Sequence, residues 1–199
     1  MEFKVYEQLW FPTPVWECPV IGIDNNAIKE YCLRVWKEKP GVQISNRGGW
    51  HSGELIHPLP ADLETLFQNL EAFVNDVCAR HTGTQDLVLG NFWININGYH
   101  DFNMPHDHQS SVLSGVYYVS VPEENMGDLV LHRGDNAEFF LTSKVTRETT
   151  MTNAQTAIKP AKESSFYIFP SWTIHHVERN ETRSERISIA FNFVHKNVL

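Results

Sequence analysis

The 199-residue sequence lacks several features that would assign it to a common class of protein. It has no apolar run near the roughly 20 residues that a membrane span needs. It has no N-terminal basic segment followed by an apolar stretch, so we expect no signal peptide. Positive charge is also scarce, since 16 lysines and arginines stand against 24 acidic residues, for a net charge of −8. This balance argues against non-specific binding to nucleic acid or to an anionic membrane.

Cysteine is sparse, and the motifs of several enzyme classes are missing. Cys18, Cys32 and Cys78 are odd in number and far apart, and no two of them form a CxxC pair. The pattern is typical of reduced thiols in the cytoplasm rather than of a disulfide framework. There is also no glycine-rich phosphate loop and no nucleophile elbow.

The length and composition predict one domain with two differently patterned parts. Hydrophobic residues make up 42% of the chain and no tract is of low complexity, which is typical of an ordered globular protein. Residues 1–85 predict an N-terminal strand and helical support, and residues 86–199 predict the β-rich core. Within the first part, the segment 45–60 is rich in glycine and proline and predicts a loop.

Two helices are predicted in the N-terminal part. Apolar side chains recur at helical spacing over 25–38, where Asp24 or Asn25 could serve as the N-cap. A stronger apolar stripe covers 61–81, and Gly83 lies just past its end. We expect both helices to pack on the core and to carry no chemistry.

From residue 86 onward, short β-type runs follow one another between clusters of glycine, proline, asparagine and aspartate. The predicted strands cover 86–97, 110–121, 127–133, 136–141, 143–151, 155–160, 164–170, 172–178 and 186–195. Strands at such short intervals are typical of an all-β sandwich or barrel. We therefore expect a mostly β fold, a jelly roll with the N-terminal helices on one outer face.

Histidine is abundant, with ten in the chain. His106 and His108 are separated by one residue, so in an extended segment both point to the same side while Asp107 points away. A third histidine follows in the pair His175-His176, of which only one can face inward because neighbours on a strand alternate. Two ligands from one strand and a third from a distant strand are typical of a metal site on a β-roll.

Arg186 lies in the last predicted strand, on the face that it shares with Ser188, Ala190 and Asn192. A buried guanidinium needs an anionic partner, because an unpaired buried charge is very costly. Beside a metal, its planar fork is suited to bind a carboxylate in bidentate fashion, and the Ser188 hydroxyl could donate to the same carboxylate.

Five segments make the sequence resemble a known family: LWFPTPVW (9–16), GGWHSGEL (48–55), HDHQSSVLSGVYYV (106–119), FPSWTIHHV (169–177) and RISIAFN (186–192). They span nearly the whole chain in order, and the last three are the most specific. On these segments the sequence resembles the non-haem iron, 2-oxoglutarate-dependent oxygenases of the prolyl-4-hydroxylase-like superfamily. More narrowly, it resembles a branch of 2OG-Fe(II) oxygenases found in bacteria and their viruses.

The resemblance implies a double-stranded β-helix fold, which is a jelly roll, with Fe(II), the co-substrate 2-oxoglutarate and O₂. By resemblance, His106 and His175 are iron ligands, and Arg186 binds the distal carboxylate of 2-oxoglutarate. The family pattern FPS-x-x-x-H-x-V selects His175 over His176.

Further co-substrate contacts are implied on the strand SVLSGVYYV. Tyr118 matches the position whose hydroxyl reaches the 2-oxoglutarate carboxylate, and Ser114 lies four residues earlier on the same face. With Ser188, these residues complete the predicted co-substrate site.

The sequence departs from the family at one ligand. The wider superfamily uses a His-x-Asp/Glu…His triad, and here His108 occupies the carboxylate position. Three neutral imidazoles would leave the Fe(II) site with a charge of +2 until the 2-oxoglutarate dianion binds. The alternative is that Asp107 turns inward as the anionic ligand, which needs a bulge or a break in the strand.

The function implied is an Fe(II)- and 2-oxoglutarate-dependent dioxygenase that hydroxylates a small-molecule or peptidyl substrate and releases succinate and CO₂. Two rival hypotheses remain: a three-histidine cupin-like metalloenzyme that does not use 2-oxoglutarate, and a non-catalytic jelly-roll binding module. His51 lies in a segment that could fold over the site as a lid or substrate contact, and Asn95 could touch the co-substrate or the substrate. A homodimer through the N-terminal strand or helices is a further hypothesis.

Overall fold

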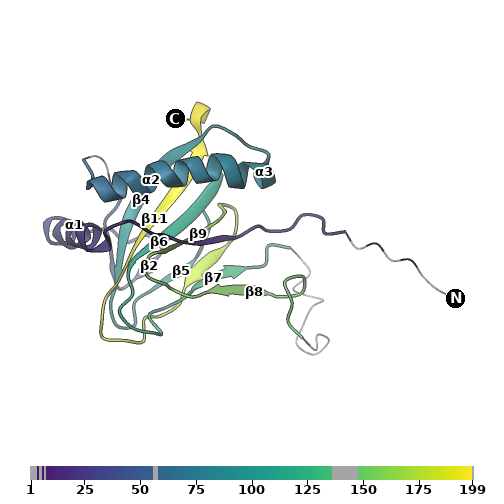
Figure 1. Cartoon of the computed structure of the whole chain (residues 1–199). Helices are drawn as coiled ribbons and strands as arrows, with labels where there is room; N and C mark the ends of the chain where they lie inside the picture. Colours follow the sequence, from purple (N-terminus) through teal and green to yellow (C-terminus); the bar gives the residue numbers. More distant parts are fainter. Residues whose placement is uncertain (1–3, 5, 7, 56–57, 136–147, 199) are drawn as a thin grey trace.

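Two antiparallel β-sheets and three N-terminal helical segments make up the fold (Figure 1). The structure is a computed structural model that describes residues 4, 6, 8–55, 58–135 and 148–198. The elements in chain order are β1 (Trp16–Pro19), α1 (Asn25–Glu38), β2 (Asn46–Arg47), β3 (Trp50–His51), α2 (Ala61–Phe73), the π-helical turn η1 (Val74–Cys78), α3 (Ala79–Thr82), β4 (Leu87–Asn97), β5 (Phe102–His106), β6 (Leu113–Ser120), β7 (Leu129–His132), β8 (Thr156–Lys159), β9 (Ser165–Pro170), β10 (His175–Val177), β11 (Arg186–His195) and the 3-10 turn η3 (Lys196–Val198).

The strands form a larger and a smaller sheet. The larger sheet has the order β1-β9-β6-β11-β4-β3, and the smaller has the order β2-β5-β10-β7-β8. Neighbours in both sheets are antiparallel, and most neighbours are distant in sequence, as in a jelly roll. The predicted fold class is therefore confirmed.

The larger sheet has two chemically different faces. On β11, Ile187, Ile189 and Phe191 belong to the apolar core that the sheet shares with α1 and α2, which lie along one side of it (Figure 1). The alternate residues Arg186 and Ser188 point the other way, into a pocket that also contains residues of the smaller sheet. Because side chains alternate along each strand, one face of the sheet packs in the apolar core and the other lines the pocket.

The helices form where the apolar spacing predicts them. Asp24 is the N-cap of α1, since its Oδ1 accepts hydrogen bonds from the backbone N–H groups of Asn26 (2.9 Å) and Ala27 (3.4 Å). The predicted helix 61–81 is interrupted by the π-helical turn between α2 and α3. It ends at Gly83, whose φ of 67° is the left-handed conformation common after a helix.

The loop prediction for 45–60 is wrong in part, because β2 and β3 lie within it. Each of these strands has two residues, too few to show an alternating pattern, and they are joined by Gly48 and Gly49, both at positive φ. The N-terminal strand was predicted without bounds and is β1, whereas β5 was not predicted. Of the predicted strands, 136–141 lies outside the described residues, and 143–151 is described only over 148–151, which form no strand.

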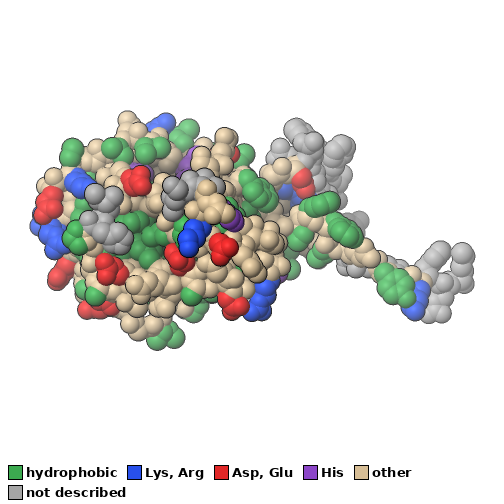
Figure 2. All heavy atoms as spheres, turned by 90° about the horizontal axis from the view of Figure 1, so that it is seen from above, with side chains coloured by type: hydrophobic (Ala, Val, Ile, Leu, Met, Phe, Trp, Pro, Cys, Tyr) green, Lys and Arg blue, Asp and Glu red, His purple; other side chains and the backbone are tan. Residues whose placement is uncertain are grey.

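Two surface features bear on possible partners. In the part of the chain that the structure describes, no helix is both long enough and apolar enough to cross a bilayer. Residues 8–13, ahead of β1, project from the body of the molecule and include hydrophobic side chains (Figures 1 and 2). Of these, Leu9, Trp10 and Phe11 are 66%, 73% and 93% exposed.

The N-cap of α1 provides a test of the fold. Asp24→Ala removes the acceptor for two helical N–H groups, and we expect the free energy of unfolding to fall by about 1 kcal/mol. Urea denaturation measures the change, and Asp24→Asn is the matched control because it keeps a capping oxygen. Equal stability of Asp24→Ala and the native chain would contradict this role of Asp24.

Candidate metal centre

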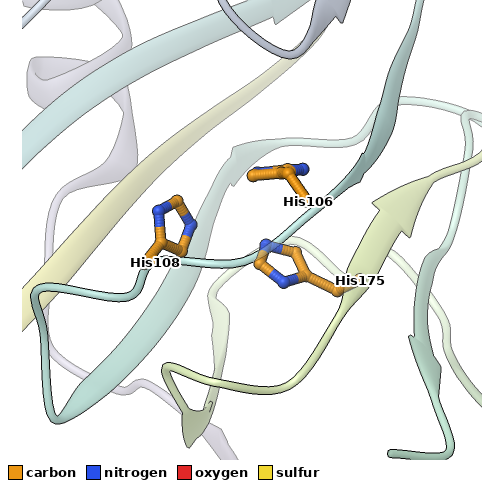
Figure 3. Close-up of side chains that lie close together, drawn as sticks. All are labelled: His106, His108 and His175. Atoms are coloured by element: carbon orange, nitrogen blue, oxygen red, sulfur yellow. The ribbon is translucent and has the colours of Figure 1, made fainter.

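Three histidine side chains converge between the two sheets (Figure 3). His106 ends β5, His108 follows two residues later, and His175 begins β10. Because β5 and β10 are antiparallel with His106 directly opposite His175, their ring centroids lie 4.3 Å apart. The His108 ring lies 5.1 Å from that of His106 and 5.2 Å from that of His175.

The three rings present nitrogen atoms that one metal ion could join. One ring nitrogen from each lies within 4.8 Å of the other two. Nδ1 of His106 lies 2.7 Å from the carbonyl oxygen of Met104, and Nδ1 of His175 lies 2.9 Å from that of Thr173. Since a carbonyl only accepts, each Nδ1 carries the proton and each Nε2 keeps its lone pair for a metal.

Burial keeps these histidines neutral. Removal from water lowers the pKa of His108 to about 4 and that of His175 to about 3, and it lowers the pKa of His106 as well. Neighbouring histidines in the cluster add to the effect, because a second positive charge nearby is unfavourable. Neutral imidazole is the form that binds a metal ion, so the donor set fits a divalent cation of the borderline type, which includes Fe(II).

Asp107 and His176, which adjoin the three histidines in sequence, do not point into the cluster. The Asp107 carboxylate accepts a long hydrogen bond (3.5 Å) from Gln109 Nε2 and is not part of the metal-ligand cluster found among the described residues. His176 lies on the opposite side of β10, where its Nδ1 is 2.7 Å from His132 Nε2. The chain leaves the strand at His106, yet His108 still turns to the side of His106 as an extended segment would predict.

The residues predicted to bind the co-substrate line the same pocket as the three histidines. From the larger sheet these are Arg186, Ser188, Tyr118 and Ser114. In the register of the sheet, Ser188 of β11 lies opposite Tyr118 of β6 on one side and Asn95 of β4 on the other. Four predicted residues from two strands therefore surround one space beside the metal-ligand cluster.

Arg186 is 2% exposed and is held by neutral oxygen atoms rather than by a carboxylate. Its Nη1 donates to the carbonyl oxygens of Met126 (2.9 Å) and Gly127, and its Nη2 donates to Asn97 Oδ1 (2.9 Å). Of the five N–H donors of a guanidinium, Nε–H and one Nη2–H remain. Nε–H is buried without a partner, and among the described ion pairs none involves Arg186.

These two remaining donors fit the carboxylate of a co-substrate. Nε–H and an Nη2–H lie on the same edge of a guanidinium, which is an edge that binds carboxylates through two parallel hydrogen bonds. Leaving a buried donor unpaired costs about 1–3 kcal/mol, and more for a charged group. The structure therefore contains a buried anion-binding group whose Nε–H donor is unpaired.

Gly127 allows the approach of its carbonyl to Arg186. Its φ is +91°, and a Cβ atom there would lie 2.9 Å from Arg186 Nη1 and 2.3 Å from the carbonyl oxygen of Glu178. Any larger residue would therefore displace the guanidinium or the chain at Glu178.

The hydroxyl groups in the pocket differ in what they can still bind. Burial raises the pKa of Tyr118 to about 12, so its hydroxyl stays protonated and can donate to a carboxylate. The Ser114 hydroxyl already donates to Asn192 Oδ1 at 2.7 Å, so it can only accept a further hydrogen bond. The predicted site residues are thus brought together, but Ser114 is the least suited of them to hold an anion.

Sequence reasoning left the roles of some residues around the pocket unresolved and missed the roles of others. Asn97 positions Arg186, as described above, and Asn95 lines the pocket with a buried Oδ1 that has no hydrogen-bond partner. Trp93 contacts the His108 ring at a centroid distance of 5.5 Å, and Phe169 contacts the His175 ring at 4.8 Å. The sequence suggested a co-substrate or substrate contact for Asn95, but it did not reveal the ring contacts of Trp93 and Phe169.

His51 does not lie in a loop over the pocket mouth. It belongs to the edge strand β3, paired with Asn95 of β4, and is 5% exposed. Its ring stacks on Trp93 with centroids 5.5 Å apart and planes 7° from parallel. The sequence marked this histidine for attention, but its contacts depend on a strand that the sequence did not predict.

The family comparison decides what this pocket belongs to. Residues 91–192, half of the chain, match the family described as "Putative 2OG-Fe(II) oxygenase". The chain belongs to this 2OG-Fe(II) oxygenase family. It is accordingly an oxygenase that depends on non-haem Fe(II) and 2-oxoglutarate. Membership favours this function over the two rivals, a cupin-like enzyme without 2-oxoglutarate and a non-catalytic binding module.

Solved structures share the fold of this oxygenase at low sequence identity. A prolyl-4-hydroxylase from Pseudomonas putida has a TM-score of 0.67 at 13% identity, with 92% of each chain covered. A prolyl hydroxylase from Trichoplax adhaerens, in complex with a hypoxia inducible factor peptide fragment, has a TM-score of 0.61 at 12% identity, covering 92% of this chain and 84% of that one. HygX from Streptomyces hygroscopicus, with nickel, 2-oxoglutarate and hygromycin B bound, has a TM-score of 0.57 at 13% identity and the same coverage. Comparison with the curated proteins gives no match.

The neutral histidines make the stability of the metal-free oxygenase depend on pH. An unfolded histidine binds a proton below its ordinary pKa of about 6.5, whereas folded His108 does so only near pH 4. The unfolded chain therefore binds more protons in this range, and the free energy of unfolding falls as the pH drops from about 6.5 toward 4. His108→Gln should reduce the proton uptake on unfolding at pH 5 by about one proton, as measured by urea denaturation across pH. Identical uptake in the variant and the native chain would contradict burial of a neutral His108.

Proposed function

We propose that His106, His108 and His175 bind the Fe(II) of this oxygenase, and that Arg186 binds the distal carboxylate of 2-oxoglutarate. The observation that carries the proposal is that one pocket contains both a three-nitrogen cluster and a buried guanidinium whose Nε–H is unpaired. Ser188 and Tyr118 supply hydroxyl groups to the same carboxylate, and Ser114 lines the pocket beside them.

The chain itself contributes binding and orientation rather than acid–base chemistry. When bound, Fe(II) and 2-oxoglutarate supply the activation of O₂ that couples oxidative decarboxylation of the 2-oxo acid to oxidation of the substrate. The neutral imidazoles donate lone pairs, and the backbone carbonyls of Met104 and Thr173 hold two of the rings in the required tautomer. Arg186 and Tyr118 orient the co-substrate, and Phe169 shields His175 from water.

We propose hydroxylation of a peptidyl or small-molecule substrate, with succinate and CO₂ as co-products. The peptide bound to the Trichoplax relative and the hygromycin B bound to HygX support these two substrate classes. The net charge of −8 supports a substrate other than nucleic acid. An assay of succinate formation with a panel of peptides and small molecules tests this proposal.

We further propose one domain over residues 1–199, a cytoplasmic location and a homodimer. The apolar core formed by α1, α2 and the larger sheet supports a single folding unit. Three free cysteines, two of them buried, support a reducing compartment. The exposed Trp10 and Phe11 on the projecting N-terminal segment support association with a second copy. Light scattering across a concentration series tests the last point.

Substitution of Arg186 tests the co-substrate site. Arg186→Gln removes the charge from a buried carboxylate-binding group, so we expect 2-oxoglutarate to bind at least about 30-fold more weakly. The measurement is succinate release from 2-oxoglutarate by the Fe(II)-loaded protein. Arg179→Gln is the matched control, because Arg179 is exposed and lies over the Phe102 ring outside the pocket. Native succinate release by Arg186→Gln would contradict the proposed site.

His108, which occupies the position of a carboxylate ligand, provides a second test of the proposed metal site. Three neutral ligands leave a charge of +2 on the metal site, and the 2-oxoglutarate dianion neutralises it. We therefore expect Fe(II) to bind at least about tenfold more tightly when 2-oxoglutarate is present, as measured by anaerobic calorimetry. His108→Asp places the negative charge on the protein, so it should preserve or improve Fe(II) binding and reduce the dependence on co-substrate. Equal Fe(II) affinity of the native chain with and without 2-oxoglutarate would contradict the three-histidine assignment.

A further inference from the structure

His108 differs from the other two histidines in how its ring is held. The rings of His106 and His175 are each fixed by a backbone carbonyl two residues earlier in the chain. The main chain at His108 is fixed, since its N–H donates to Ser171 O and its carbonyl accepts from Ser111 N–H, both at 3.0 Å. Its ring nitrogens have no hydrogen-bond partner among the described residues. The orientation of the ring is therefore set by packing.

The packing partner on the outer side of the cluster is Trp93. Its ring lies 5.5 Å from the His108 ring at an interplanar angle of 55°. The other ring contacts of His108 are with His106 and His175, which are themselves members of the cluster. Trp93 is therefore the aromatic neighbour from outside the cluster that can restrict rotation of the His108 ring.

Trp93 is in turn backed by His51. The two rings are nearly parallel, 7° apart, at a centroid distance of 5.5 Å, which is an offset stack. His51 is itself held in place, because its Nδ1 accepts a hydrogen bond of 3.0 Å from the backbone N–H of Gly53. Its backbone pairs with Asn95 of β4 on one side and bridges to Val42 on the other. The order of contacts is thus a fixed His51, then Trp93, then His108.

We infer that Trp93 and His51 are positioning residues that aim the ring of His108 at the metal. This inference rests on the proposed function, because it takes His108 as a metal ligand. A carboxylate offers two oxygens with several lone pairs, and so tolerates rotation about its side-chain bonds. An imidazole offers one lone pair in the plane of its ring, and a misaligned ring is a poor ligand. The stack therefore supplies the orientation that a histidine needs and that an aspartate at this position would not.

Metal titration of variants in the stack tests this inference. Trp93→Leu removes the surface against which the His108 ring packs, and His51→Ala removes the backing of Trp93. We expect each variant to bind Fe(II), titrated anaerobically, about tenfold more weakly than the native chain. The visible absorption spectrum of the Co(II)-loaded protein should change as well, because it reports the arrangement of ligands around the metal. Trp93→Phe and His51→Phe keep an aromatic ring and should restore most of the affinity.

The same substitutions in a His108→Asp background separate positioning from general destabilisation. Because a carboxylate at position 108 does not need to pack against the Trp93 ring to be oriented, Trp93→Leu should weaken Fe(II) binding much less in this background than in the native chain. An equal loss in both backgrounds would overturn the inference. Native Fe(II) affinity in Trp93→Leu that remains folded by circular dichroism would overturn it too, and His51→Ala serves the same comparison if the leucine variant does not fold.

Two controls complete the experiment. Phe92→Leu alters the neighbouring side chain on β4, which points to the helices and packs against Phe67, so it should lower stability without changing Fe(II) affinity. His175→Ala removes a proposed ligand and should abolish stoichiometric binding. If His175→Ala bound Fe(II) as the native chain does, the proposed metal site itself would fail, and this result differs from a failure confined to the Trp93 and His51 variants.

Discussion

The pairing of β5 with β10 sets the geometry on which the rest of the site depends. It places His106 directly opposite His175, so the sheet hydrogen bonds themselves fix the separation of two of the three rings. Strand pairing also selects between adjacent histidines, because a shift by one residue would turn His176 inward and His175 outward. In the observed register His176 meets His132 on the outer side of the smaller sheet. A backbone interaction therefore determines which side chains can become metal ligands.

The larger sheet provides the second half of the site through the same alternation. Its outer face is apolar and packs under the helices, while its inner face carries the guanidinium, the hydroxyls and the amides. Burial lowers the pKa of both kinds of titratable group there, but their ordinary pKa values are far apart. It therefore keeps the histidines neutral and ready to bind a cation, whereas Arg186 stays charged, with its Nε–H unpaired and ready to bind an anion. The pocket thus holds complementary binding groups for a metal ion and a dicarboxylate.

Much of the fold and of the candidate site could be predicted from the sequence, and the reasons are physical. The helix 25–38 and the strand 186–195 carry long periodic patterns, and the structure has both with the predicted bounds. The convergence of His106, His108 and His175 followed from alternation and from the family resemblance. By contrast, β2 and β3 have two residues each, and their pairing depends on neighbours that no local pattern reveals. The contact of His51 with Trp93 could not be predicted for the same reason, since it requires β3 to be in place.

The hydrogen bonds that fix the Arg186 guanidinium have a consequence for the choice of co-substrate. Its Nη1 donates to the main-chain carbonyls of Met126 and Gly127, and its Nη2 donates to Asn97, so three hydrogen bonds hold the guanidinium in place. In the proposed assignment, this guanidinium fixes where the distal carboxylate of the co-substrate lies relative to the histidine cluster. A 2-oxo diacid one carbon shorter or longer would then fit the guanidinium or the metal site less well than 2-oxoglutarate does.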